Sequence, residues 1–215
     1  MKKTFLLLTG FMLYCSLLNA QYFSGDTKPV SFGARAGLQF ANVSQSSDGV
    51  EVSYSSLMSP SIGFFAEIKL SDKMVFQPEL LYNRFGTKYT YNVPDLGIPG
   101  FPTSGEIKLN LDYLSMPIFV KSRIGESKLH LYGGPQIGYL LGSSASMGGT
   151  TVTGETDELK KLDLGGAFGA EYQLSDNFGA TFRYYTGFSN IAKPADGETG
   201  TMKNKAFGIS ISYRF

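Results

Sequence analysis

Long polar connections and tight turns alternate strictly along this chain, and the alternation constrains the fold more than any single segment does. The long connections, rich in Ser, Gly, Asn, Pro and charged residues, span 42–57, 87–106, 142–160 and 192–204. The tight turns between them lie at 71–73, 125–127 and 175–177. These seven connections separate eight candidate strands, and the alternation places both chain ends on the side of the short turns.

The candidate strands alternate apolar and polar residues, most clearly in the last stretch, 205–215. One parity of this stretch carries Phe207, Ile209, Ile211, Tyr213 and Phe215, whereas the other carries small or polar residues and Arg214. Such a strand has one apolar face, as lipid-facing barrel strands do, although a strand in a soluble sheet also alternates. We therefore expect strands over 31–41, 58–70, 74–86, 107–123, 128–141, 161–174, 178–190 and 205–215.

The amino-terminal segment has the three regions of a secretory signal peptide. Lys2 and Lys3 precede an apolar run over 5–18, and Asn19-Ala20-Gln21 follows, which predicts cleavage after Ala20. A membrane-spanning helix needs about 20 apolar residues, and Gly, Ser or a charge interrupts every later segment. We expect an exported chain that enters a membrane only through strands, with a signal peptide over 1–20, a short periplasmic segment over 21–30 and a barrel over 31–215.

Charge and residue content exclude several classes of protein. Without Lys2 and Lys3, the chain has 17 basic and 18 acidic residues. The resulting net charge of −1 gives no indication of nucleic-acid binding. Cys15 is the only cysteine and lies within the signal peptide, so the exported protein has no disulfide. A Ser or Asp mechanism normally needs a histidine base, and we expect the single histidine, His130, to be structural. The sequence therefore predicts no enzyme activity, no cofactor and no metal centre.

The polar parity of the strands carries charged residues that a closed barrel would place in or near its interior. They are five basic and four acidic residues: Arg35, Glu67, Lys69, Glu79, Lys121, Asp163, Glu171, Arg183 and Arg214. An eight-stranded barrel is just wide enough for its own side chains, and an unpaired buried charge is costly. We expect these charges to pair in a packed polar interior, with glycines of the same parity making room for Arg and Tyr side chains. A water-filled or solute-selective path is the alternative.

The stretch 107–123 departs from simple alternation. Leu109 and Leu111 lie on the opposite parity from Leu114 and the apolar residues that follow it. A phase slip near Asp112 and an extension of the strand above the membrane both explain this, and the sequence does not choose between them.

The long connection 87–106 has apolar side chains among its prolines and glycines. They are Tyr89, Tyr91, Leu96, Ile98 and Phe101. Because loops carry much of the function of proteins, we expect this connection to be the candidate contact surface. It could equally fold over the mouth of the barrel.

Several short motifs resemble one family over the whole exported chain. They are Asn19-Ala20-Gln21, Gln77-Pro78-Glu79-Leu80 with Tyr82, Tyr113-Leu114-Ser115-Met116-Pro117 to Lys121, Gly133-Gly134-Pro135 and Arg183-Tyr184. They resemble the outer-membrane β-barrel domain family, also called porin-family or PorT-like proteins. Ser115 departs from the pattern, because that family often has an acidic residue at this position. The resemblance implies an integral outer-membrane protein of a Gram-negative-type cell, in a family whose members mostly have no assigned biochemical activity.

The predicted fold is all-β, an eight-stranded antiparallel transmembrane up-and-down β-barrel. Only a closed barrel of strands satisfies every backbone group in lipid. Its expected partners are the outer-membrane bilayer, the barrel-assembly machinery that would recognise the terminal strand ending in Phe215, and an extracellular or periplasmic protein. We expect a non-enzymatic structural or interaction role, through the extracellular loops or through periplasmic partners. Two other functions stay open: a narrow channel or transporter, and a soluble periplasmic ligand-binding barrel with its apolar parity inside.

Overall fold

Ten strands make up the described part of the chain, which comprises residues 30–47, 50–52, 55–92, 104–147, 150–154, 159–193 and 201–215. In this computed structural model the strands are β1 (Val30–Ser47), β2 (Val50–Val52), β3 (Ser55–Lys69), β4 (Met74–Asn92), β5 (Ser104–Arg123), β6 (Leu129–Met147), β7 (Thr150–Gly154), β8 (Leu162–Gln173), β9 (Phe178–Gly187) and β10 (Thr201–Arg214). The predicted signal peptide and nearly all of the predicted periplasmic segment lie outside the described residues. Among the described residues, no helix is long and apolar enough to cross a membrane.

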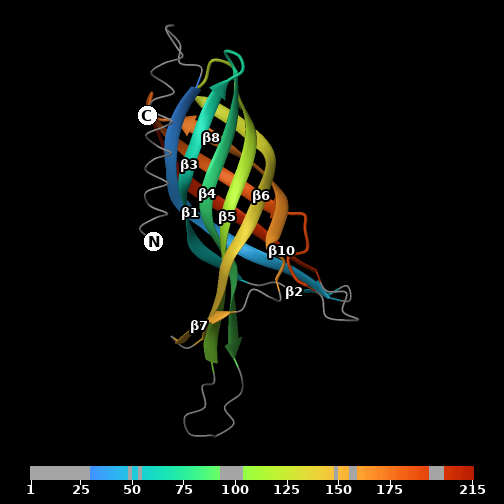
Figure 1. The fold of residues 1–215 in the computed structure, drawn as a ribbon. Coiled ribbons are helices and arrows are strands. Elements are labelled where there is room, and N and C mark those ends of the chain that lie inside the picture. The colour runs from blue at the N-terminus through green and yellow to red at the C-terminus, as the bar shows by residue number, and fades with distance from the viewer. Residues whose placement is uncertain are drawn as a thin grey trace, which may run out of the picture. The chain divides into compact units, whose positions relative to one another are not determined.

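Eight of these strands close into a ring (Figure 1). The order around the ring is β1, β3, β4, β5, β6, β8, β9 and β10, and β10 pairs with β1 from Gly33 opposite Arg214 to Ser46 opposite Thr201. Neighbours in the ring are consecutive in the sequence apart from the short β2 and β7, which makes the topology up-and-down. The predicted eight-stranded antiparallel barrel is therefore confirmed.

The predicted tight turns and the carboxyl terminus lie at one end of the ring, called here the turn end. The Leu70 amide donates to the Met74 carbonyl at 2.9 Å, and the Leu174 amide donates to the Phe178 carbonyl at 2.8 Å. The amide of Phe215 reaches the Phe32 carbonyl at 2.9 Å, which fixes the last residue beside the start of β1. The opposite end, with the longer connections, is called here the loop end.

Strands occupy parts of all four predicted long connections, since β10 begins at Thr201, inside the connection predicted over 192–204. β1 continues to Ser47, where it pairs with β2. β4 extends to Asn92 and pairs there with the start of β5 at Ser104. β6 extends to Met147 and pairs with β7 (Figure 1). These segments are short and rich in Ser, Thr and Gly, so they show little of the long alternation that marks a half-buried strand. Backbone pairing and polar cross-strand contacts hold them instead, for example the 3.0 Å bond between the Ser146 and Thr151 hydroxyls.

The irregularity expected near Asp112 lies in the neighbouring strand. Asp112 pairs with Gly142 and Tyr113 pairs with Leu140, so Leu141 of β6 is the extra residue of a bulge. β5 keeps one parity through this point, because Leu111 and Tyr113 are both buried. The extension of β5 beyond the apolar surface is thus the correct explanation, and a phase slip within β5 is wrong.

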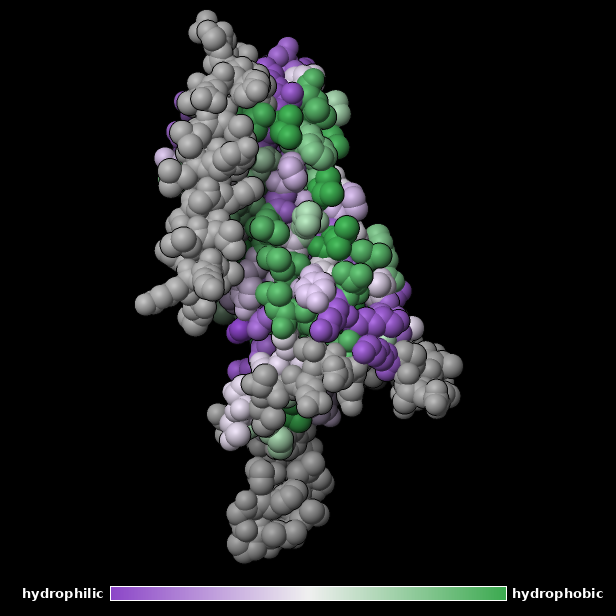
Figure 2. All heavy atoms as spheres, viewed as in Figure 1, coloured by the Kyte–Doolittle hydropathy of each residue, from purple (hydrophilic) through white to green (hydrophobic). Residues whose placement is uncertain are grey.

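The apolar parity faces outward all around the ring. Ile209 and Ile62 are exposed, whereas residues of the other parity such as Ser212 and Ser115 are buried. On the side shown in Figure 2, this apolar surface covers the barrel and gives way to hydrophilic residues toward the loop end. The arrangement suits lipid contact and contradicts the soluble alternative, which requires the apolar parity inside.

Candidate functional site

Seven charged side chains cross the interior as one chain in which cations and carboxylates alternate. The order is Arg214, Glu67, Lys121, Glu171, Arg35, Glu79 and Arg183. Successive N···O distances are 2.7, 2.6, 2.6, 3.2, 3.5 and 2.9 Å. This set is called here the charge chain.

Seven strands of the ring each contribute one residue to the charge chain, and the eighth strand contributes a residue that contacts it. The seven charged residues come from β10, β3, β5, β8, β1, β4 and β9 in that order. The remaining strand, β6, supplies Tyr132, whose hydroxyl accepts a 3.3 Å hydrogen bond from Nε of Arg183. Residues far apart in sequence meet here, since Arg214 and Glu67 are 147 positions apart. The charge chain therefore ties all eight strands together.

The middle of the charge chain is buried. Lys121 and Arg35 are each 2% exposed, and Glu79 is 3% exposed. In such an environment removing one partner typically costs about 3–5 kcal/mol, because the other charge is left buried and uncompensated. The arrangement thus stabilises one particular assembly of the strands.

Aromatic rings and glycines complete the middle of the interior. The Arg183 guanidinium lies 4.7 Å from the centroid of the Phe119 ring and 5.4 Å from that of Tyr132. A Cβ added at Gly169 would lie 2.6 Å from the Tyr132 hydroxyl, so only glycine leaves room for this ring. The predicted role of the inner glycines holds at this position.

Two residues predicted for the polar interior lie outside the charge chain. Lys69 is exposed at the turn end, where its Nζ lies 3.0 Å from Oδ1 of Asp72. Hydrogen bonding and the positive charge of Lys69 hold the pKa of the Asp72 carboxyl below its usual range. The prediction for Lys69 is corrected in this respect, because Lys69 is the last residue of β3 and its side chain pairs with Asp72 in the turn.

Asp163 is buried but has no cationic partner among the described residues. Its carboxylate accepts hydrogen bonds from Nδ2 of Asn204 at 2.9 Å and from Oγ of Ser189 at 3.0 Å. The expectation that every inner charge pairs with an opposite charge is therefore wrong for this residue. Neutral donors from β10 and from the residues after β9 satisfy it instead.

Apolar and aromatic side chains close the interior toward the loop end. Phe85 packs against Tyr113 and Tyr185 at centroid distances of 5.6 and 5.2 Å. Leu111 and Ile191 above them are fully buried. Ile191 is fixed by two backbone bonds, because its carbonyl accepts from the Lys160 amide at 2.8 Å and its amide donates to the Met202 carbonyl at 2.9 Å. We call these residues, with Leu140, the apolar cap.

One feature of the sequence could have predicted part of the apolar cap. Leu111 and Leu140 sit on the otherwise polar parity of their strands, which places apolar side chains inside the barrel. Ile191 gave no such signal, since it falls between a predicted strand and a predicted long connection. Its burial depends on the contact between the segments around Leu159 and Ala192, which no local pattern encodes.

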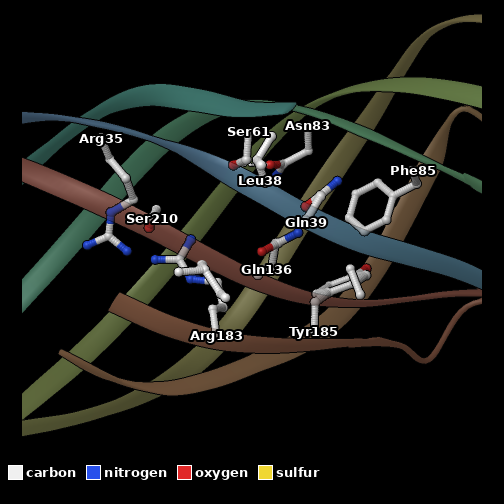
Figure 3. A pocket seen from close by; sticks show the side chains of 13 residues that line it. Arg35, Leu38, Gln39, Ser61, Asn83, Phe85, Gln136, Arg183, Tyr185 and Ser210 are labelled. Atoms are coloured by element: carbon white, nitrogen blue, oxygen red, sulfur yellow. Dashed lines mark hydrogen bonds between the residues drawn. The ribbon is translucent and has the colours of Figure 1, made fainter. Parts of the chain in front are cut away.

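A cavity of about 30 Å³ lies between the charge chain and the apolar cap. Figure 3 shows Arg35 and Arg183 toward one side of it and the rings of Phe85 and Tyr185 toward the other. A space of this size holds one or two water molecules. Among the described residues, no three His, Cys, Asp or Glu side chains come together in a way that could hold a metal ion.

The predicted contact and assembly residues are only partly described. Tyr89 is 49% exposed near the end of β4, whereas Leu96, Ile98 and Phe101 lie outside the described residues, and for Tyr91 only the backbone in β4 is described. On β10 and at the carboxyl terminus, the outward side chains of the terminal segment are exposed: Phe207, Ile209, Ile211, Tyr213 and Phe215.

Solved outer-membrane proteins are similar to this chain in fold. Neisserial surface protein A (NspA) gives a TM-score of 0.50 at 17% identity, over 87% of this chain and 100% of NspA. Ail of Yersinia pestis gives 0.49 at 15% identity over 87% and 100%, and OprG of Pseudomonas aeruginosa gives 0.43 at 14% identity over 87% and 97%. No curated protein matches the chain. At these identities, the likeness to NspA shows the fold alone.

A family model supplies the assignment that the structural likeness does not. The model described as the outer membrane protein beta-barrel domain matches residues 19–193, which is most of the chain. It agrees with the closed ring and the outward apolar parity described above. The narrower PorT-like resemblance stays a prediction. The chain belongs to the outer membrane protein beta-barrel domain family and is an integral protein of the outer membrane.

Proposed function

We propose that this protein is a non-enzymatic and non-conducting outer-membrane barrel that acts through its exposed surfaces. The filled interior is the observation that carries the proposal. The charge chain occupies the half of the interior nearer the turn end, the apolar cap closes the loop end, and the cavity between them measures only about 30 Å³. A solute path would require both obstructions to rearrange.

The exposed surface best suited to a partner is the extension formed by β4, β5, β6 and β7 beyond the apolar surface. Nζ of Lys88 and Nζ of Lys108 lie 3.1 and 2.9 Å from the Glu106 carboxylate, which links the extended parts of β4 and β5. Tyr89, the next residue after Lys88, is exposed on the other face of β4. These features support an extracellular protein contact through the region around 87–106.

Three further features belong to the same proposal. We propose that the signal peptide is removed after Ala20 and that residues 21–30 form a short periplasmic segment. We also propose that the assembly machinery recognises the outward aromatic and aliphatic residues of β10 together with Phe215. The support for the last point is the exposure of this terminal row of side chains.

Single-channel recording of the refolded mature protein in a planar bilayer tests the proposal. Folding is checked first by a shift in gel mobility between unboiled and boiled samples, so that a misfolded and silent sample is not counted. We expect a folded barrel without discrete openings. Discrete openings that disappear in the boiled sample would overturn the proposal and support the channel alternative.

A further inference from the structure

The outward cations of the strands are distributed unequally between the two ends of the barrel. Among the described residues, all five Lys and Arg residues on the outward parity lie at the loop end: Arg84, Lys88, Lys108, Lys203 and Lys205. At the turn end the outward parity stays apolar to the last residues, as with Tyr213 and Leu131. Because the outward cations lie only at the loop end, we expect them to contact a ligand that is present on that side of the membrane.

Some of these cations already have carboxylate partners. Arg84 pairs with Asp112 at 2.6 Å, and both Lys88 and Lys108 pair with Glu106. No ion pair is found for Lys203 or Lys205 within the part of the chain that the structure describes. The same holds for Lys160 and Lys161, which directly precede β8. At the loop end, the described cations for which no ion pair is found are therefore those of β10 and of the segment just before β8.

Backbone bonds bring the two pairs of unpaired lysines together. The Lys160 amide donates to the Ile191 carbonyl, and the Ile191 amide donates to the Met202 carbonyl, so only one residue separates these segments across the sheet. Lys160, Lys161 and Lys205 are exposed, and Lys203 is half-buried. We call these four residues the lysine cluster.

The lysine cluster lies directly beyond the lipid-facing surface. Lys205 is the next outward residue after Phe207, and Phe207 pairs with the equally exposed Phe40 of β1. On the side that it shows, Figure 2 has hydrophilic residues toward the loop end, beyond the apolar surface of the barrel. Lysine side chains at such a boundary extend toward lipid headgroups and attract their negative charge.

We propose that the lysine cluster binds the phosphate groups of a phosphorylated glycolipid in the outer leaflet. Each ammonium is a compact cation with three hydrogen-bond donors, which suits a phosphate without demanding one fixed geometry. The short turns of outer-membrane barrels face the periplasm and the longer loops face outward, so the cluster meets the outer leaflet. This lipid site requires a closed barrel in a lipid bilayer. It does not depend on whether the barrel conducts solutes or binds a protein partner.

Retention of diphosphoryl lipid A tests this proposal. The refolded full mature chain is purified from mixed micelles that contain this lipid, and bound lipid is counted by native mass spectrometry. The test variant carries Lys160→Gln, Lys203→Gln and Lys205→Gln. The control carries Lys69→Gln, Lys73→Gln and Lys128→Gln at the turn end, where the same charge is removed from exposed positions.

We expect the wild type and the turn-end control to retain the lipid, and the loop-end variant to lose at least roughly tenfold in retention. Equal loss in both variants, or in neither, would overturn the proposal. Excess inorganic phosphate should leave the retention of lipid A unchanged if the lysine cluster binds the phosphate groups as part of a lipid. Full displacement of lipid A by inorganic phosphate would overturn the assignment to a lipid. The gel-mobility shift confirms that each variant is folded.

Discussion

Lys121 is the position at which the energetic role of the charge chain is best tested. Its Nζ lies 2.6 Å from Oε1 of Glu67 and 2.6 Å from Oε1 of Glu171, and the residue is 2% exposed. Lys121→Met keeps much of the side-chain volume but removes the charge. Two carboxylates then each lose one cation in an interior where water cannot replace it.

The structure sets the expected size of this loss. Removing one member of a buried ion pair typically costs about 3–5 kcal/mol of unfolding free energy. Glu67 keeps Arg214 at 2.7 Å and Glu171 keeps Arg35 at 3.2 Å, so neither carboxylate is left alone. We therefore expect Lys121→Met to lie near the lower limit, about 3 kcal/mol.

Urea unfolding of the refolded barrel in lipid vesicles measures this loss. Lys69→Met is the matched control, because the same substitution at an exposed pair is expected to cost much less where water already screens the charge. The double variant Lys121→Met with Glu171→Gln should recover part of the loss, since contacting groups typically show coupling of about 0.5–3 kcal/mol. Equal losses for Lys121→Met and Lys69→Met would refute a stabilising charge chain.

Two further predictions concern the outward face and the terminal strand. Ile209→Arg places a charge on the exposed apolar face and should lower the unfolding free energy by roughly 2–4 kcal/mol in the same urea assay; an unchanged urea midpoint would mean that the two faces are assigned backwards. Deletion of Phe215 should lower the amount of heat-modifiable barrel in the membrane fraction of cells, and unchanged assembly would argue against recognition of the terminal strand.

The barrel itself could be predicted because its lipid-facing strands obey a pattern of period two. In β10 and at the carboxyl terminus, every second residue from Phe207 to Phe215 is apolar, and the structure exposes this set on the outer face. Parity also places Arg35, Glu79 and Lys121 in the interior, where they are buried. Each of these predictions requires only that successive side chains of a strand point to opposite faces of the sheet.

Features that depend on contacts between distant segments could not be predicted in this way. β7 is a short, Thr-rich strand, so its pairing with β6 could not be detected from an alternation of apolar and polar residues. The extra residue Leu141 is identified only by the unequal count of paired residues on β5 and β6. Ile191 is buried through bonds to Lys160 and Met202, which belong to two other segments.

The charge chain resolves an ambiguity that the apolar face leaves open. Shifting one strand by a single residue turns its apolar set inward, but a shift by two residues preserves the parity and would satisfy the lipid. Such a shift moves a charged side chain about 7 Å along its strand, farther than an ion pair tolerates. Contacts across the seam between β1 and β10, such as Arg214 with Glu67 and Arg35 with Glu171, form only in one register. The apolar parity therefore selects which face meets lipid, and the charges inside select the register in which the ring closes.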